Sequence, residues 1–200
     1  MMRYLAKTVG FALSMGLWAA NPPQESKPVT NWDTSLPSAL SELHKLEFDF
    51  ADGEGIDFEP FGAFLSAEET ASWIKAWTGN KEANGEQLRV FGQDGTGGYA
   101  AFWLVDAKKN ILEQPIVFFG SEGDRGVVAA NFNDYLWLLA GGMGPKEAVY
   151  FPGLKRESNS TFMEFAEEHA SGSRLAPKEI VAKANGAYPG FEAWVQSICR

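Results

Sequence analysis

The apolar positions along the chain change their spacing from helical to alternating and back again. Residues 66–79 repeat apolar side chains every three to four positions, which predicts an amphipathic helix with one buried face. The shared face consists of Thr70, Trp73, Ile74 and Trp77. Ser66 and Glu69 have the spacing of a capping box, so the helix is expected to begin at Ser66. Gly79 or Asn80 is expected to end it.

Four short apolar runs follow, and each of them predicts a β-strand. Each is rich in β-branched or aromatic residues and is separated from the next by a polar or glycine-containing turn. The runs are residues 88–91, 99–105, 116–119 and 127–130. Short connections between successive strands predict an antiparallel sheet. The run 99–105 is apolar on both faces, so it is expected to lie centrally.

The segment 115–142 is the most informative part of the chain because it holds a strand, a turn, a strand and a helix. Asn131 or Asn133 is expected to cap the helix 134–140, and Gly141 with Gly142 to end it in a left-handed turn. This helix is almost entirely apolar, which predicts burial on most sides. We therefore expect it to serve architecture, and function to lie in the turns.

Further helices are expected at both ends of this sheet. Residues 38–46 form one candidate, Thr161 and Glu164 have capping-box spacing for a second, and Pro177 stands at the first position of a third. A last amphipathic helix carries Phe191, Trp194, Val195 and Ile198. Helices, then strands, then helices predict an α+β fold with a central, mostly antiparallel sheet flanked by helices.

The N-terminal residues allow two interpretations. Arg3 and Lys7 precede the apolar run 9–20, which has the outline of a secretory signal but also the spacing of a packed helix. The run is too short for a transmembrane helix. We favour the packed helix and hence a cytoplasmic protein, with export as the alternative. The predicted organisation is an N-terminal helix and linker at 1–37 and one domain at 38–200.

Composition narrows the kinds of partner. The chain has 26 acidic and 17 basic residues, a formal net charge of −9, and 45% hydrophobic residues with seven Trp. That composition supports a substantial core and argues against direct binding of nucleic acid, which requires clustered cations. It suits a basic protein partner, although acidity also serves solubility alone. Cys199 is the single cysteine, so no internal disulfide can form.

No spacing typical of a catalytic, cofactor or metal site is present. The glycine-rich residues 92–98 lack the Lys-Ser/Thr pair of a phosphate loop and join two strands, so they predict a hairpin turn. His44 and His169 lack metal-ligand spacing and are expected to be solvated on helices. A pair of carboxylates could still act as acid and base in a small hydrolase. The pairs considered are Glu122 with Asp124, and Asp52 with Asp57.

Two stretches resemble the SMI1/KNR4, or SUKH, superfamily. They are residues 88–106, LRVFGQDGTGGYAAFWLVD, and residues 115–142, PIVFFGSEGDRGVVAANFNDYLWLLAGG, with the upstream run 64–69 resembling the start of an early family helix. The similarity covers about residues 45–151, which leaves 152–200 as a C-terminal helical extension. The resemblance implies an α+β fold. Many bacterial members are immunity proteins that neutralise a cognate toxin, often a nuclease, and fungal members regulate cell-wall synthesis.

The function expected from these observations is that of a non-catalytic, cytoplasmic protein-binding module. The resemblance implies an immunity protein that binds a toxin domain, and the charge predicts that this domain is basic. A small hydrolase and a regulatory scaffold of cell-wall synthesis are the alternatives. No cofactor, nucleic acid or membrane span is expected, and the oligomeric state is left open. The candidate contact residues are Asp94, Glu122 and Asp124, with Asp52, Glu54 and Asp57 in a second loop.

Overall fold

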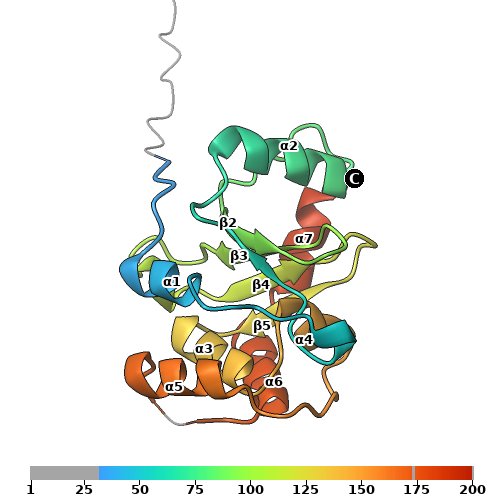
Figure 1. The fold of residues 1–200 in the computed structure, drawn as a ribbon. Helices are drawn as coiled ribbons and strands as arrows, with labels where there is room; N and C mark the ends of the chain where they lie inside the picture. Colours follow the sequence, from blue (N-terminus) through green and yellow to red (C-terminus); the bar gives the residue numbers. More distant parts are fainter. Residues whose placement is uncertain (1–31, 173, 200) are drawn as a thin grey trace, which may run out of the picture. The chain divides into compact units, whose positions relative to one another are not determined.

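A five-stranded antiparallel sheet organises the chain, whose computed structural model describes residues 32–172 and 174–199 (Figure 1). The strands lie in chain order, and each pairs with the next: β1 (Glu59–Pro60), β2 (Leu88–Gln93), β3 (Tyr99–Trp103), β4 (Ile116–Phe119) and β5 (Arg125–Ala129). The expected α+β class with a flanked antiparallel sheet is therefore confirmed. The expected N-terminal helix or signal lies outside the described residues.

Helices cover both faces of this sheet (Figure 1). They are α1 (Ser38–Leu43), α2 (Ala67–Thr78), α3 (Phe132–Ala140), α4 (Pro145–Tyr150), α5 (Ser160–His169), α6 (Pro177–Ala187) and α7 (Phe191–Ile198), with short 3₁₀ turns η1 (Ala51–Gly53) and η2 (Ile111–Glu113). Helices α1, α3 and α5 pack on one face, whereas α2 and α7 pack on the other. Within the parts described, no helix has the length and apolar character needed to cross a membrane.

Strand β4 shows why the sheet is buried on both sides. Ile116 and Phe118 point into the core with α3, and Val117 and Phe119 point into the core with α2 and α7. Successive side chains of a strand alternate between faces, so a strand covered on both faces must be apolar throughout. The segment 116–119 meets that requirement, as its fully buried side chains show.

A bulge in β2 changes which face its side chains reach. Val90 pairs with Ala101 and Gly92 pairs with Ala100, so Phe91 is an extra residue in the strand. Phe91 joins the α3 core, and Gly92 lies against the ring of Phe58. A Cβ atom on Gly92 would lie 2.1 Å from that ring, which explains why glycine is needed in the strand.

Most of the expected helix ends are confirmed. The Ser66 side chain accepts from the amide of Glu69, whose carboxylate accepts in return from the Ser66 amide, and the helix ends at Gly79 with a φ of 67°. Asn131, not Asn133, caps α3. At the other end of α3 only Gly142 is left-handed, with a φ of 76°. Its amide bonds to Leu139 and the next amide to Leu138, which is a Schellman motif.

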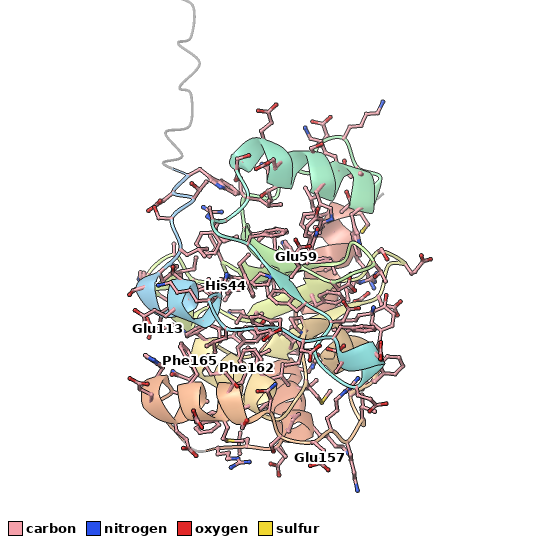
Figure 2. The ribbon with its side chains drawn as sticks, in the orientation of Figure 1. His44, Glu59, Glu113, Glu157, Phe162 and Phe165 are labelled. Atoms are coloured by element: carbon pink, nitrogen blue, oxygen red, sulfur yellow. The ribbon has the colours of Figure 1, made fainter. Side chains whose placement is uncertain are left out.

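One expected cap is wrong. Helix α5 is capped by Asn159, whose side chain accepts from the amide of Phe162, and not by Thr161 with Glu164. Asn is as good an N-cap as Thr or better, and its position places Phe162 in the core (Figure 2). Phe162 packs there against Phe48 with ring centroids 4.8 Å apart. Pro177 does open α6, as expected.

Several element boundaries differ from those expected. Helix α1 ends at Leu43, three residues early, and β3 ends at Trp103, after which the Leu104 amide bonds to Gln87 outside the ladder. Helix α3 begins two residues earlier than expected, because Asn131 is its cap. Strand β5 is also shifted and spans Arg125–Ala129 rather than 127–130, since the Arg125 backbone pairs with Phe119.

Candidate functional site

Two hairpin turns lie side by side at one end of the sheet, next to the paired strands β3 and β4. Tyr99 pairs with Phe119, so the turn 94–98 before β3 lies beside the turn 120–124 after β4. The hydroxyl groups of Ser121 and Thr96 are 3.4 Å apart across this junction. We call the surface formed here by Asp57, Asp94, Glu122, Asp124, Lys146 and Tyr150 the acidic loop face.

Asp94 lies inside its turn and is only 2% exposed. One carboxylate oxygen accepts from the amides of Thr96 and Gly98 at 2.9 and 2.7 Å and from the Thr96 hydroxyl at 2.9 Å. A carboxylate that satisfies several donors within its own turn holds the backbone in place. Asp94 therefore supports this surface and is not an exposed contact residue.

Lys146 joins Asp94 to a third loop. Its Nζ atom lies 2.5 Å from Asp57 Oδ2 and 3.7 Å from Asp94 Oδ2, and Asp57 Oδ1 accepts from the amide of Gly95 at 2.8 Å. Burial alone would lower the pKa of Lys146, but the hydrogen bond and charge of Asp57 outweigh it and raise that pKa. The two carboxylates are thus held by an ammonium group behind the turns.

Glu147 is the buried neighbour of this ion pair. Its carboxylate accepts from the amide of Gly144 at 3.0 Å, which secures the first turn of α4, and lies 3.4 Å from the amide of Asp57. Burial raises the pKa of Glu147, and these amide hydrogen bonds only partly oppose the effect. The residue links α4 to the loop that carries Asp57.

Tyr150 connects α4 to the turn 120–124. A Cβ atom on Gly120 would lie 2.4 Å from the Tyr150 hydroxyl, so the phenol packs directly on that glycine. Burial raises the pKa of Tyr150, and the charge and hydrogen bonding of Asp124 raise it further. Glu122 and Asp124 themselves are exposed. From the other side, Trp77 Nε1 donates to the Gly120 carbonyl at 2.9 Å and fixes the turn to α2.

Asp52 and Glu54 belong to a separate surface. Both are exposed on the turn around η1, where Asp52 has a left-handed φ of 52°. Among the described residues no hydrogen bond or ion pair joins either carboxylate to the acidic loop face. The turn is tied instead to Arg156, whose Nη2 donates to the Gly53 carbonyl at 2.7 Å. The structure therefore brings together four of the six predicted residues.

Sequence reasoning missed the residues that hold this surface. Lys146 and Glu147 follow Gly144 and Pro145, a recognisable helix start, but nothing local indicates that they meet a loop 90 positions earlier. Tyr150 had no local signal either. Asp94 did have one, since Asp before Gly-Thr-Gly-Gly is typical of a side chain that closes its own turn.

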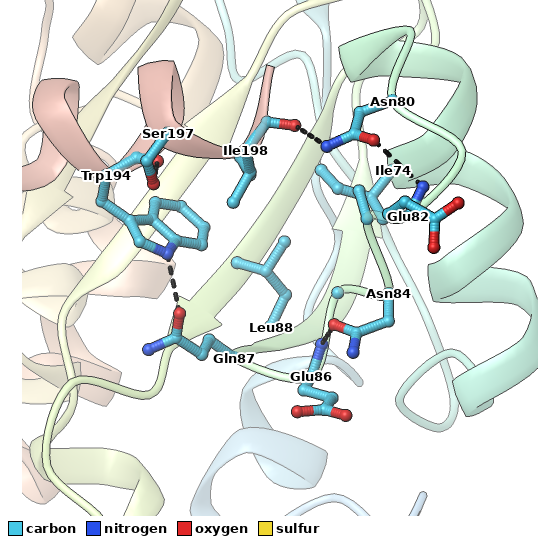
Figure 3. Close-up of a pocket in the computed structure, with 12 residues that line it drawn as sticks. Ile74, Asn80, Glu82, Asn84, Glu86, Gln87, Leu88, Trp194, Ser197 and Ile198 are labelled. Carbon is cyan, nitrogen blue, oxygen red and sulfur yellow. Dashed lines mark hydrogen bonds between the residues drawn. The ribbon is translucent and has the colours of Figure 1, made fainter. Parts of the chain in front are cut away.

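The nominated carboxylate pairs are not arranged around a described pocket. A pocket of about 250 Å³ lies between α2 and α7, with Ile74, Leu88 and Trp194 in its wall (Figure 3). Its polar groups are paired with one another, such as Trp194 Nε1 with Gln87 Oε1 at 2.7 Å. None of the four nominated carboxylates lines it. Asp57 is moreover engaged by Lys146.

The histidines differ in their surroundings. His44 is half-buried and not solvated as expected, because its ring packs against Phe58 and Phe91 and its Nδ1 lies 2.7 Å from the Phe61 carbonyl oxygen. Burial lowers the pKa of His44. His169 stacks on Phe165 at the end of α5. The described residues contain no group of three or more His, Cys, Asp or Glu placed to hold a metal ion.

Comparison of the chain with protein-family models, with curated proteins and with solved structures finds no match.

Proposed function

We propose that the protein is a non-catalytic binding module that takes a basic protein partner on the acidic loop face. The observation that carries this proposal is the convergence of two hairpin turns, anchored by Asp94 and Lys146, which presents Glu122 and Asp124 to solvent. A preorganised turn loses little conformational freedom when it binds. Exposed carboxylates in fixed positions favour encounter with a cationic surface.

The contact set follows from burial. Asp94 is internal and Asp57 is held by Lys146, so both serve as supports rather than contacts. Glu122 and Asp124 are the contacts we assign, with Asp52 and Glu54 on the η1 turn as a second exposed acidic site. The net charge of −9 adds long-range attraction for a basic partner.

Exposed aromatic side chains supply apolar anchors. Phe151 is 55% exposed directly after Tyr150, and Phe50 is 54% exposed before the η1 turn. Large aromatic residues that reach solvent are typical anchors in protein interfaces. Phe50 precedes Asp52 in the chain, and Phe151 follows Tyr150, which packs on the turn of Glu122 and Asp124, so a partner could combine charge attraction with aromatic burial.

A cytoplasmic immunity function is the form of this proposal that the SUKH resemblance supports. In that form the partner is the catalytic domain of a toxin, and the protein masks it without chemistry of its own. The fold class agrees with that resemblance, and the nominated carboxylate pairs lack a shared described pocket.

The proposal predicts a toxin gene beside the gene of this chain, and co-expression with the basic domain of that toxin tests it. We expect the wild-type chain to protect the host, and the double variant Glu122→Lys, Asp124→Lys to lose protection. Glu82→Lys, Glu86→Lys is the matched control, because it reverses two other exposed carboxylates with the same change in net charge. Continued killing in the presence of folded wild-type protein, or equal protection by both double variants, would contradict the proposal.

A further inference from the structure

A second surface lies where the end of α3 meets the start of α6. A groove of about 340 Å³ there is lined by Trp137, Gly141, Arg156, Arg174 and Pro177, among others. It adjoins a second cavity of about 430 Å³ that shares Gly141, Arg156 and Pro177 and adds Leu154 to the wall. We call these two adjoining cavities the α3–α6 groove.

The walls of this groove depend on two glycines. A Cβ atom on Gly141 would lie 2.4 Å from Pro177 Cγ, and one on Gly142 would lie 2.3 Å from the Glu157 carbonyl oxygen. Only glycine lets the start of α6 and the segment around Arg156 approach the end of α3 this closely. The Gly-Gly pair therefore shapes the groove as well as ending the helix.

Three N–H donors are buried in the groove wall without an acceptor. Trp137 is only 8% exposed, and its Nε1 has no hydrogen-bond partner among the described residues. The same holds for Nε and Nη1 of Arg156, whose Nη2 alone is used by Gly53. A buried donor without an acceptor destabilises the fold, and more so when it carries charge. Native proteins leave few such groups unpaired, and water, an ion or a ligand completes many of those that remain.

Further cations surround the groove. Lys155, Arg174 and Lys178 are exposed and line its two cavities, and within the described chain none of them forms an ion pair with a carboxylate. Elsewhere the described chain pairs two lysines with carboxylates, namely Lys146 with Asp57 and Lys183 with Asp134. Four cations thus line the groove without a carboxylate ion pair among the described residues, in a chain of net charge −9.

The nearest carboxylates are engaged or directed elsewhere. Glu179, in the first turn of α6, accepts from the amide of Ala176 at 3.0 Å. Glu157 follows Arg156 on the outer loop (Figure 2) and is exposed. Arg156 is close enough to Glu147 for its charge to lower that pKa, but no hydrogen bond joins the two side chains among the residues described. Among the residues described, none of the three donor nitrogen atoms is therefore hydrogen-bonded to an internal anion.

We propose that the α3–α6 groove binds a small organic anion. Its phosphate or carboxylate head accepts from Trp137 Nε1 and from the guanidinium of Arg156, with Arg174 adding charge. Its apolar body lies over Leu154 and Pro177 in the adjoining cavity. Trp137 and Arg156 line the groove, but these three nitrogen atoms expose almost no surface, so binding must shift nearby side chains and change the surroundings of the Trp137 indole. This site is independent of the acidic loop face.

Titration of the full-length protein with four probes, followed by the indole N–H signals in ¹H–¹⁵N spectra, tests the site. The probes are phenyl phosphate, inorganic phosphate, benzoate and the neutral benzyl alcohol. We expect the Trp137 signal, identified by its loss in Trp137→Phe, to shift with phenyl phosphate at lower concentration than with inorganic phosphate. Benzoate distinguishes the head groups: a shift at lower concentration than with phenyl phosphate indicates a carboxylate ligand, and a shift at higher concentration indicates a phosphate.

Two variants separate this site from a general effect. Trp137→Phe keeps an aromatic ring but removes the N–H, and we expect it to weaken phenyl phosphate binding, measured for both variants by isothermal titration calorimetry, roughly tenfold. Trp103→Phe is the matched control, because Trp103 Nε1 is also buried without a partner but lies in the opposite core against Phe191. The proposal is overturned if no anion shifts the Trp137 signal at millimolar concentration, if benzyl alcohol shifts it equally, or if both variants bind alike.

Discussion

The acidic loop face and the α3–α6 groove treat their charged groups in opposite ways. At the acidic loop face, Asp57 and Asp94 are held by Lys146 and by backbone amides, so the interior of that surface is complete. In the groove, the indole of Trp137 and most of the Arg156 guanidinium lack acceptors among the described residues. The buried charges of the acidic loop face are thus satisfied within the fold and support the exposed carboxylates. In the α3–α6 groove, the proposed ligand would supply the missing acceptors.

This difference shows how to assign roles to charged residues. A carboxylate in a loop is not a contact residue merely because the loop is polar, as the buried Asp94 demonstrates. Helix α3 was expected to be architecture only, and the proposed groove site would give its Trp137 a further role. Whether a group's hydrogen bonds are satisfied within the fold decides more than its residue type does.

The largest expected effect is the loss of the support within the acidic loop face. Asp94→Ala removes the acceptor for two amides and a hydroxyl and leaves Lys146 with Asp57 alone. We expect the free energy of unfolding in urea to fall by about 3 kcal/mol. Glu122→Ala is the control and should change it by less than about 0.5 kcal/mol. Equal effects of the two changes would remove the distinction between support and contact.

Gly120→Ala should have a smaller effect on the same face. The added methyl group would overlap the Tyr150 hydroxyl, so the phenol and the turn 120–124 must separate. Overpacking of this kind costs about 1–3 kcal/mol, and less where the neighbouring side chain can move. Urea unfolding measures it, and Gly123→Ala, at an open but left-handed position, reports the cost of backbone strain alone. Restored stability in Gly120→Ala, Tyr150→Phe would confirm the contact.

The pH dependence of stability tests the burial of Glu147. Because its pKa is raised in the folded chain, the folded state holds this proton more tightly than the unfolded state does. The contribution of Glu147 to the free energy of unfolding therefore falls as pH rises from the ordinary glutamate range through the raised pKa. We expect Glu147→Gln to flatten this part of the profile, measured by urea unfolding at a series of pH values. An unchanged profile would mean that the carboxylate is not desolvated behind this face.

The smallest effect is expected for the exposed ion pair between Arg125 and Glu192. Arg125 Nε lies 3.0 Å from Glu192 Oε2, but the two side chains are 27% and 51% exposed. Exposed ion pairs contribute about 0–1 kcal/mol because water screens them and long side chains lose freedom. Arg125→Gln should lower the midpoint of thermal unfolding by no more than a few degrees, and less in high salt. A loss as large as that of Asp94→Ala would contradict the ranking.

Local patterns predicted much of the fold. The capping box at Ser66, the hairpin turn 92–98 and the glycine end of α3 depend on neighbouring residues, and all three occur. Element ends were less accurate where two caps competed, as at Asn159 and Thr161. The preference for Asn over Thr as an N-cap is small, so it does not decide between these two positions. The burial of Phe162 in the core agrees with the start at Asn159.

The site was less predictable, for a physical reason. The pairing of Lys146 with Asp57 spans 89 positions. Among the described residues Trp137 Nε1 has no acceptor, and this depends on how α6 and the segment around Arg156 pack beside it. Sequence patterns report burial through periodicity, but they do not report which distant group satisfies a buried hydrogen bond. The sequence predicted that the loops are acidic. It did not predict which of their carboxylates support the fold and which are exposed to a partner.

Association kinetics with the partner that the proposal predicts, the basic domain of a toxin encoded beside this chain, test the central claim most directly. The full-length wild-type protein, the Glu122→Lys, Asp124→Lys variant and the charge-matched Glu82→Lys, Glu86→Lys variant would be compared by stopped flow at low and at physiological salt. If the acidic loop face binds the partner, the first variant associates at least tenfold more slowly than the matched control, and added salt narrows the gap. Equal association rates for the two variants would contradict the account.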